Sequence, residues 1–221
     1  MNLQVCCPYK KCPFGCPTCI AATDYQYPYG DIYFTNKQKY LELLKSTIGQ
    51  YDKYILTGDT EPTLFYEWIQ DVCTVLKGQE IELQTKNYWV DLNKIEGFVD
   101  TLAISIPTLK DWEKYKPMAL QLFSFAGKIR LVFLEVKELE SSNLLNETIL
   151  ADQITVKRLQ LPEAEEERKA VEAMRGNTTF WHLFLKINEN ACSCRYDVNC
   201  MDAAGRYKIL RTDGNFYDKW F

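Results

Sequence analysis

Short apolar runs alternate with longer amphipathic stretches along most of this chain. The apolar runs predict six strands, at residues 3–7, 53–57, 80–85, 101–106, 129–136 and 154–159. The stretches between them predict helices at residues 36–48, 62–76, 109–125 and 162–174, and a shorter helix that begins near Asp91. Strands and helices that alternate in this way are typical of repeated β-α units around a largely parallel sheet.

The pattern changes after Gly176. An aromatic run is followed by three cysteines and then by two short apolar runs around Asp213-Gly214, a pair that predicts a hairpin turn. A segment of this size is too small to fold alone without a metal or a neighbour. We therefore expect a core over residues 1–176 and a C-terminal cap over residues 177–221 that packs on the core, rather than a seventh repeat.

Composition narrows the class of protein. The chain has 221 residues, 47% of them apolar, and a formal net charge of −4, which predicts one sizeable core and excludes a uniformly basic surface for binding nucleic acid. No run approaches the roughly 18 apolar residues of a membrane span. We expect a cytoplasmic protein without a membrane segment. His182 is the single histidine, which excludes a histidine-based catalytic triad.

The cysteines are unevenly distributed. There are nine, and five of them lie within the first nineteen residues: Cys6, Cys7, Cys12, Cys16 and Cys19. An odd number that is crowded into one short segment fits metal or cluster binding in a reducing cytosol better than a disulfide framework.

Cys12, Cys16 and Cys19 stand at a C-x3-C-x2-C spacing in a segment that contains Pro13, Gly15 and Pro17. Such a loop can wrap three thiolates around one face of a [4Fe-4S] cluster and leave the fourth iron without a protein ligand. The alternative is a structural zinc site, whose tetrahedral shell would need a fourth ligand from Cys6, Cys7 or a distant residue.

A second motif follows the second predicted strand. Gly58-Asp59-Thr60-Glu61-Pro62 looks like the Gly-Gly-Glu-Pro segment of the radical S-adenosylmethionine (radical SAM) superfamily, and the cysteine spacing after the first strand resembles that family as well. In the family this segment holds the amino group of the methionine moiety through backbone carbonyls and the acidic side chain. Glu61 and Pro62 match the pattern, while Thr60 stands where the second glycine is usual.

The resemblance implies a fold and further cofactor-binding positions. The fold is an α/β partial (β/α)6 barrel, similar to a TIM barrel, with a short C-terminal extension. Residues 84–87 resemble a segment that often reads Thr-Asn-Gly in the family. Ser105 stands where relatives commonly offer a hydroxyl or amide to the ribose or carboxylate of the cofactor, and we expect Arg130 to meet that carboxylate. Thr18 replaces the aromatic residue that usually packs near the adenine.

The resemblance also implies an activity: reductive cleavage of S-adenosylmethionine by a [4Fe-4S] cluster, giving a 5'-deoxyadenosyl radical that abstracts hydrogen from a substrate. The electron donor would be a protein such as flavodoxin or ferredoxin. The substrate, whether a small molecule, a nucleoside or a protein, stays open. The alternatives are an activating enzyme for a glycyl radical protein and a non-catalytic iron-sulfur or zinc protein that binds a partner or, with an iron-sulfur cluster, transfers electrons.

Three further cysteines lie in the tail. Cys192, Cys194 and Cys200 form a candidate site for an auxiliary cluster, because several radical SAM groups carry extra clusters in C-terminal extensions. The alternative is that they are unliganded thiols within the cap.

Overall fold

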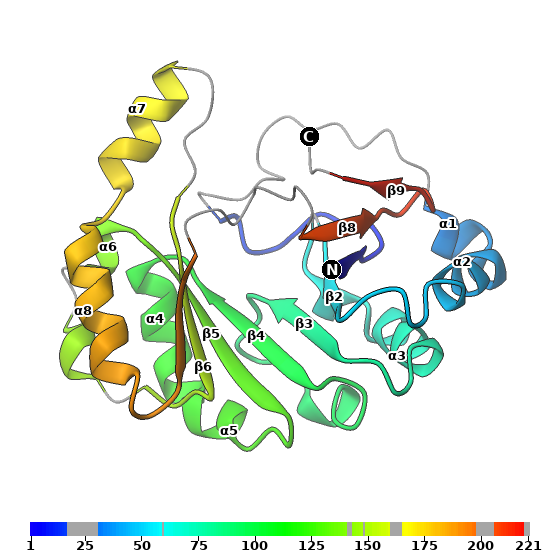
Figure 1. Cartoon of the computed structure of the whole chain (residues 1–221), viewed down its shortest axis with the longest axis horizontal. Coiled ribbons are helices and arrows are strands. Elements are labelled where there is room, and N and C mark those ends of the chain that lie inside the picture. The colour runs from blue at the N-terminus through cyan, green and yellow to red at the C-terminus, as the bar shows by residue number, and fades with distance from the viewer. Residues whose placement is uncertain are drawn as a thin grey trace. The chain divides into compact units, whose positions relative to one another are not determined.

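The computed structural model describes residues 1–16, 31–58, 60–140, 143–147, 149–159, 165–197 and 206–218. The chain divides into two compact units (Figure 1). The first unit comprises Met1–Ala103 together with Asp202–Phe221, and the second comprises Ile104–Met201. Strand β4 (Thr101–Ile106) contains the boundary between them.

The sheet of the first unit is built around the N-terminal strand. Its strands are β1 (Asn2–Cys6), β2 (Tyr54–Thr57), β3 (Ile81–Thr85), β8 (Tyr207–Leu210) and β9 (Phe216–Tyr217), in the order β3-β2-β1-β8-β9. The first four of these strands run parallel, and β9 pairs antiparallel with β8. Val5 of β1 pairs with Leu56 on one side and with Leu210 on the other, and all three side chains are fully buried.

Two helices of the first unit begin at polar caps, Asp31 and Asn36, and the two longer helices pack on one another through aromatic residues. The helices are α1 (Ile32–Thr35), α2 (Lys37–Lys45) and α3 (Tyr66–Val75), with 3-10 turns η2 (Pro62–Leu64) and η3 (Leu92–Lys94). The side chain of Asn36 caps α2 by accepting a hydrogen bond from the backbone N–H of Lys39 at 3.1 Å. Trp68 of α3 donates its indole N–H to the hydroxyl of Tyr40 of α2 at 3.2 Å, and both side chains are buried.

The second unit contains three further parallel strands, β5 (Lys128–Leu134), β6 (Gln153–Lys157) and β7 (Ser193–Asp197), in that order. Its helices are α4 (Leu109–Tyr115), α5 (Ala119–Phe123), α6 (Lys137–Glu140), α7 (Glu165–Met174) and α8 (Thr178–Asn188), with 3-10 turns η4 (Lys116–Met118) and η5 (Leu144–Asn146). The core centres on Phe133 of β5. The rings of Trp112, Trp181 and Phe184 have centroids 5.7, 6.2 and 5.3 Å from the Phe133 ring.

The six strands predicted from the apolar runs are confirmed, each within two residues at either end. The predicted helix over residues 109–125 is divided instead into α4, η4 and α5, because Pro117 cannot donate a backbone hydrogen bond inside a continuous helix. The predicted hairpin turn is confirmed, since Asp213 and Gly214 lie between β8 and β9. The predicted short helix near Asp91 is the 3-10 turn η3.

The tail differs from the expectation that no further repeat follows Gly176. Helix α8 leads into β7, which pairs parallel with β6, and these elements add one more helix-strand unit. The pattern missed β7 because its sequence, Ser-Cys-Arg-Tyr-Asp, has no apolar run and its side chains are partly or fully exposed. The division into a core and a cap, and closure of the sheet into a partial barrel, stay predictions. Within the described part of the chain, no helix has the length and apolar character needed to cross a membrane.

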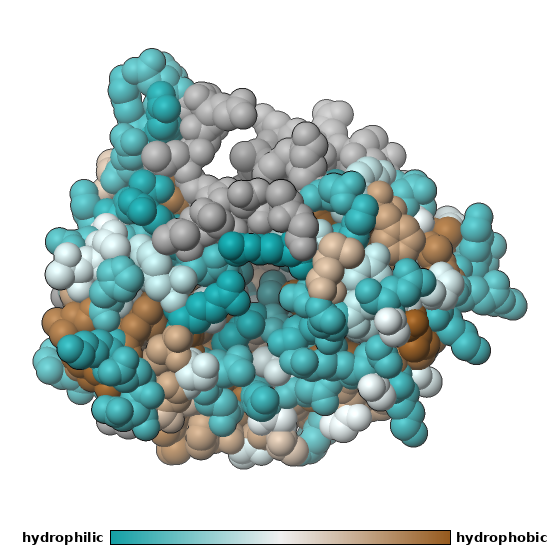
Figure 2. Space-filling model, viewed as in Figure 1, coloured by the Kyte–Doolittle hydropathy of each residue, from teal (hydrophilic) through white to brown (hydrophobic). Residues whose placement is uncertain are grey.

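Polar side chains cover most of the described surface on the face shown in Figure 2, with apolar patches between them. Several large apolar side chains remain exposed, among them Phe34 at 63%, Trp89 at 57% and Leu120 at 78%. Exposed apolar residues that occur singly are normal in folded proteins and need no partner to explain them.

Candidate functional site

The chemistry-bearing residues of the first unit follow the carboxyl ends of parallel strands. Strand β1 ends at Cys6, β2 at Thr57 and β3 at Thr85, and the motif segments follow each of these ends. Because the strands are parallel neighbours, their carboxyl ends meet at one edge of the sheet. Ligands of open α/β sheets bind at this edge.

Glu61 lies at the centre of this edge. The residue is 4% exposed, and its carboxylate accepts four hydrogen bonds. Oε1 accepts from the backbone N–H of Thr63 at 3.1 Å, from the Thr63 hydroxyl at 2.9 Å and from the Thr85 hydroxyl at 2.5 Å, and Oε2 accepts from the backbone N–H of Lys86 at 3.0 Å. The acidic residue of the motif therefore joins the loop after β2 to the end of β3.

The segment after β3 extends this network. The side-chain amide of Asn87 donates to the Thr63 hydroxyl at 3.0 Å, and the backbone N–H of Asn87 donates to the Thr85 hydroxyl at 2.8 Å. Burial raises the pKa of the Glu61 carboxyl above its ordinary value, although the hydrogen bonds from Thr85, Lys86 and Thr63 act in the opposite direction. The carboxylate is held in a nearly fixed position because donors from two loops converge on it.

Gly58 is required by a close approach within the same loop. Its φ angle is +154°, in a region that side-chain-bearing residues rarely adopt. A Cβ atom at this position would lie 2.8 Å from Sγ of Cys7 and 3.1 Å from the Cys7 backbone nitrogen. Cys7 in turn donates its backbone N–H to the Thr57 carbonyl at 2.7 Å, and its thiol lies 3.9 Å from the Thr60 carbonyl oxygen. Cys7 therefore packs directly against the loop that contains Glu61.

Thr60 contributes a hydroxyl group to this loop. The residue is 8% exposed, and within the described residues its buried Oγ1 has no hydrogen-bond partner. A buried hydroxyl without a partner costs about 1–3 kcal/mol of stability. An orphaned polar atom of this kind is what a loop that binds a polar ligand is expected to present before the ligand arrives.

The predicted cluster ligands lie partly inside the described part of the chain. Cys12 and Cys16 follow β1 and are partly buried, whereas Cys19 and Thr18 lie outside the described residues, as does Asp59. Among the residues that the structure describes, no three His, Cys, Asp or Glu side chains are grouped closely enough to hold a metal ion. The chemistry of the donor set fits an iron-sulfur cluster, because the segment after β1 supplies the thiols of Cys12, Cys16 and, in sequence, Cys19 at a C-x3-C-x2-C spacing.

The other predicted cofactor residues belong to the second unit. Ser105 is a partly buried residue near the end of β4. Arg130 lies near the beginning of β5, where it pairs with Gln153 of β6. Their contribution to a cofactor site stays a prediction.

Two of the three tail cysteines lie side by side. The sulfur atoms of Cys192 and Cys194 are 3.5 Å apart at the beginning of β7, and Cys200 lies outside the described residues. Burial raises the pKa of both thiols, and the neighbouring Cys192 thiol helps to raise the pKa of Cys194 to about 12. Without a metal, both groups stay protonated near neutral pH.

Sequence reasoning missed a buried charge in the second unit. Glu135, directly after β5, is fully buried; its Oε1 accepts a hydrogen bond from the Thr178 hydroxyl at 2.8 Å, and its Oε2 lies 3.5 Å from Nε of Arg158. Burial and the Glu135 carboxylate raise the pKa of Tyr196, whose ring lies 4.7 Å from that of His182. In the sequence, the only sign of this contact is a glutamate at the end of an apolar run. Such a sign does not identify the partners of the side chain.

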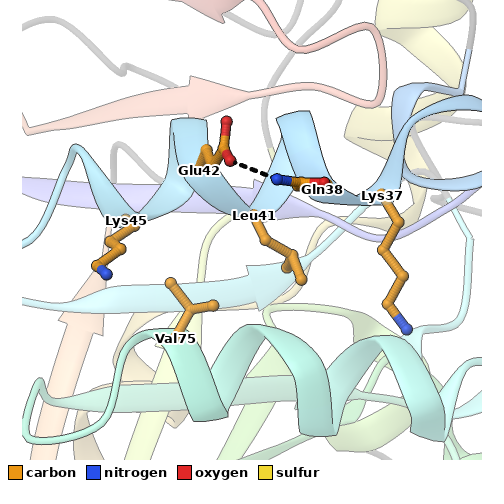
Figure 3. Close-up of a pocket in the computed structure, with 6 residues that line it drawn as sticks. All are labelled: Lys37, Gln38, Leu41, Glu42, Lys45 and Val75. Carbon is orange, nitrogen blue, oxygen red and sulfur yellow. Dashed lines mark hydrogen bonds between the residues drawn. The ribbon is translucent and has the colours of Figure 1, made fainter.

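A shallow groove of about 440 Å³ lies between α2 and α3 (Figure 3). It is lined by Lys37, Gln38, Leu41, Glu42, Lys45 and Val75. The side chains of Leu41 and Val75 face one another, and Gln38 and Glu42 form a hydrogen bond of 2.9 Å on the same helix. None of the lining residues is a cysteine, and the charged groups of Lys37 and Glu42 are engaged by Glu67 and Gln38, so we do not assign the function to the groove.

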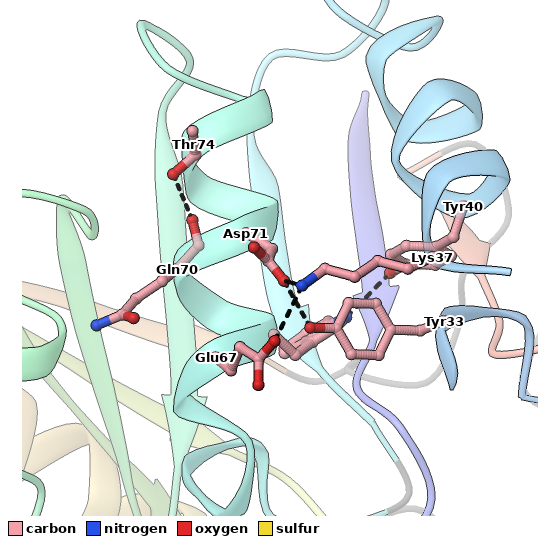
Figure 4. Close-up of polar contacts among 8 residues, drawn as sticks. Tyr33, Lys37, Tyr40, Glu67, Gln70, Asp71 and Thr74 are labelled. Atoms are coloured by element: carbon pink, nitrogen blue, oxygen red, sulfur yellow. Dashed lines mark hydrogen bonds and ion pairs between the residues drawn. The ribbon is translucent and has the colours of Figure 1, made fainter. Parts of the chain in front are cut away.

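A polar network joins the same helices beside the groove (Figure 4). Asp71 accepts a hydrogen bond from the Tyr33 hydroxyl at 2.6 Å and pairs with the Lys37 ammonium at 2.5 Å, while Glu67 pairs with Lys37 at 3.0 Å. Burial, followed by the hydrogen bond to Asp71, raises the pKa of Tyr33, and the hydrogen bonds to Asp71 and Glu67 raise the pKa of Lys37. These shifts favour the neutral phenol and the charged ammonium, which is the pattern of a structural network.

No protein-family model matches the chain, and no curated protein matches it either. Solved structures do match. The chain shares the fold of SuiB from Streptococcus suis. The structure of SuiB bound to S-adenosylmethionine matches with a TM-score of 0.64 at 11% sequence identity, and a second SuiB structure matches with a TM-score of 0.63 at 12% identity. Each match covers 99% of this chain and 60% of SuiB, so the chain spans well under two thirds of that protein's length.

Proposed function

We propose that the chain is a radical SAM enzyme whose [4Fe-4S] cluster is held by Cys12, Cys16 and Cys19. The observation that carries the proposal is the ligand edge of the first unit, where the buried Glu61 and the orphaned Thr60 hydroxyl follow β2 and the cysteine segment follows the neighbouring β1. The shared fold with SuiB, which binds S-adenosylmethionine, supports the same class.

Within this proposal, each residue predicted from the sequence has a task. The three thiolates hold the cluster, and the loop from Gly58 to Glu61 receives the amino group of S-adenosylmethionine. Ser105 is proposed to contact its ribose or carboxylate, Arg130 its carboxylate, and Thr18 is proposed to serve near the adenine. When bound, the cluster and S-adenosylmethionine supply reductive cleavage of a carbon–sulfur bond and a 5'-deoxyadenosyl radical that abstracts hydrogen from a substrate.

The contribution of the protein is to position these groups. Gly58 allows the loop to approach Cys7 closely, and the Glu61 network ties the loop to the end of β3, so its carbonyl groups are fixed before the cofactor binds. A fixed polar loop lowers the entropic cost of holding a reactive cofactor in one orientation. An electron donor such as flavodoxin or ferredoxin and a cytoplasmic location belong to the same proposal.

Anaerobic reconstitution tests this assignment. We expect a brown protein with about four irons per cluster that releases 5'-deoxyadenosine when it is given S-adenosylmethionine and dithionite. A colourless protein that binds zinc would instead support the structural-zinc alternative. A brown protein that binds iron but leaves S-adenosylmethionine intact would support a non-catalytic electron-transfer protein.

The close pair of Cys192 and Cys194 favours a second metal-binding role in addition to the first. We propose that these thiols, together with Cys200, hold an auxiliary cluster, which would raise the iron content to about eight per chain. Replacing Cys194 with Ala should then return the iron content to about four without loss of the first cluster. Iron near four in the unmodified protein would reject the auxiliary cluster.

Residues 177–221 are proposed to cover the substrate site, and a truncation after Gly176 tests this cap. The truncation removes β7 and β8, the strands that pair with β6 and β1. We expect a protein that aggregates through the exposed strand edges, or that cleaves S-adenosylmethionine without productive turnover. Full substrate turnover by the truncated protein would reject the cap.

A further inference from the structure

We propose that the side-chain hydroxyl of Thr60 is a direct contact for the amino group of S-adenosylmethionine, and that Glu61 acts mainly as a positioning residue. This inference rests on the proposed function, because it concerns the same cofactor site. It assigns the contact to Thr60, which stands where the motif usually has its second glycine.

Hydrogen bonds from the protein already occupy most of the Glu61 carboxylate. Its Oε1 already accepts three hydrogen bonds, two from Thr63 and one from Thr85, and its Oε2 accepts one from Lys86. A carboxylate offers about four acceptor sites in total, two on each oxygen. Oε1 therefore accepts more bonds than its two sites, and only Oε2, which accepts one, has a site left, so the main role of Glu61 is to organise the two loops.

Thr60 offers a side-chain oxygen beside Glu61. Its hydroxyl is buried and has no hydrogen-bond partner within the described residues, although it directly precedes Glu61 at the ligand edge. The backbone does not require glycine here, since every positive φ angle among the described residues belongs to a glycine and Thr60 has none. A threonine at this position adds a hydroxyl acceptor without backbone strain.

The amino group of the ligand needs more than one acceptor. An amino group offers several N–H donors, and a single remaining site on Glu61 can satisfy one of them. The Thr60 oxygen provides a second side-chain acceptor directly beside the first in sequence, where a glycine would provide only its backbone carbonyl. The loop therefore suits a ligand whose amino group donates more than one hydrogen bond.

The test uses the reconstituted full-length chain and two probes. S-adenosylhomocysteine carries the amino group, and 5'-deoxy-5'-methylthioadenosine lacks the whole amino-acid part. Thr60→Val removes the hydroxyl at nearly constant shape and should weaken S-adenosylhomocysteine binding roughly tenfold. Thr60→Ser keeps the hydroxyl and should bind it within about twofold of the unmodified protein. Binding of methylthioadenosine should be the same in all three proteins.

Thr47→Val is the matched control, because Thr47 is also buried but its hydroxyl bonds to the Leu44 carbonyl beyond the opposite end of β2. Thr60→Gly removes the same hydroxyl by a second route and guards against misfolding of the Val variant. Unchanged S-adenosylhomocysteine affinity in either hydroxyl-free variant that retains its iron would overturn the inference and leave the proposed function intact. Failure of the unmodified protein to bind S-adenosylhomocysteine would reject both.

Discussion

The hydroxyl of Thr85 donates a hydrogen bond of 2.5 Å to Oε1 of Glu61, and both groups are buried. This contact connects the last residue of β3 to the loop after β2, two segments that are far apart in sequence. An intramolecular hydrogen bond of this kind typically contributes about 0.5–1.5 kcal/mol to stability. The motif residue therefore stabilises the edge of the sheet on which the proposed cofactor would bind.

Replacing Cys16 with Ala should abolish the cluster, because a site with three thiolates has no spare ligand. Cys73→Ala is the control: Cys73 is buried in α3, and burial raises its pKa to about 12, so it stays a protonated core residue. Iron and sulfide analysis after anaerobic reconstitution should show loss of the cluster in the first variant and full content in the second. Full iron content in Cys16→Ala would remove this cysteine from the site.

The raised pKa of Glu61 predicts how its contribution to stability depends on pH. The folded protein keeps the Glu61 proton at pH values where the unfolded chain has lost it. Its contribution to the free energy of unfolding is therefore greatest below the ordinary glutamate pKa of 4.5, and it falls as pH rises through the folded pKa.

Urea unfolding of the unmodified protein and of Glu61→Gln, over a series of pH values, measures this dependence. The other titrating groups are common to both proteins, so the difference between their free energies of unfolding isolates Glu61. We expect this difference, unmodified minus variant, to decline as pH rises. A difference that grows with pH would mean that the hydrogen bonds from Thr63, Thr85 and Lys86 outweigh burial.

The close approach of Gly58 to Cys7 can be measured by paired substitutions. Gly58→Ala places a Cβ atom 2.8 Å from the Cys7 sulfur, in addition to the strain of its positive φ angle. Gly78 also has a positive φ angle, +87°, but an added Cβ there meets nothing within 4 Å. We expect Gly58→Ala to lower the free energy of unfolding by about 1–3 kcal/mol more than Gly78→Ala. Equal losses would show that Cys7 moves aside without cost.

Thr178 and Thr179 provide a matched pair at the start of α8. The hydroxyl of Thr178 donates to the fully buried Glu135, whereas Thr179 is exposed. Thr178→Val should reduce the free energy of unfolding by about 1–3 kcal/mol, because it leaves a buried carboxylate with one donor fewer. Thr179→Val should change it by no more than about 0.5 kcal/mol. A neutral Thr178→Val would indicate that Arg158 and Tyr196 satisfy Glu135 without it.

The sequence predicts elements best where burial is complete. The run Leu131-Val132-Phe133 is buried on both faces of β5 and stands out as an apolar strand. Strand β7 carries Ser193 and Arg195, both exposed, and its pairing with β6 depends on the tertiary fold rather than on its composition. A strand that is stabilised by its neighbour, rather than by its own apolar residues, cannot be predicted from the pattern of apolar and polar residues.

The residues of the candidate site can also be predicted only in part from the sequence. The spacing of Cys12 and Cys16 and the Glu61-Pro62 pair mark the ligand edge in the sequence. The contact between Glu135 and Thr178 joins residues 43 positions apart and has no local signature. It forms because β5 and α8 pack together through Phe133 and Phe184. A buried acidic residue can be suspected from sequence, but its partners are determined by packing.

The position of β1 between β2 and β8 has a consequence for the order in which the chain can fold during synthesis. Strand β1 leaves the ribosome long before β8, one of its two hydrogen-bonding partners, because the two strands lie at residues 2–6 and 207–210. At typical elongation rates the wait is roughly ten seconds or more. For that time the edge of β1 can pair with another nascent chain, so growth conditions that slow translation should favour aggregation of this protein.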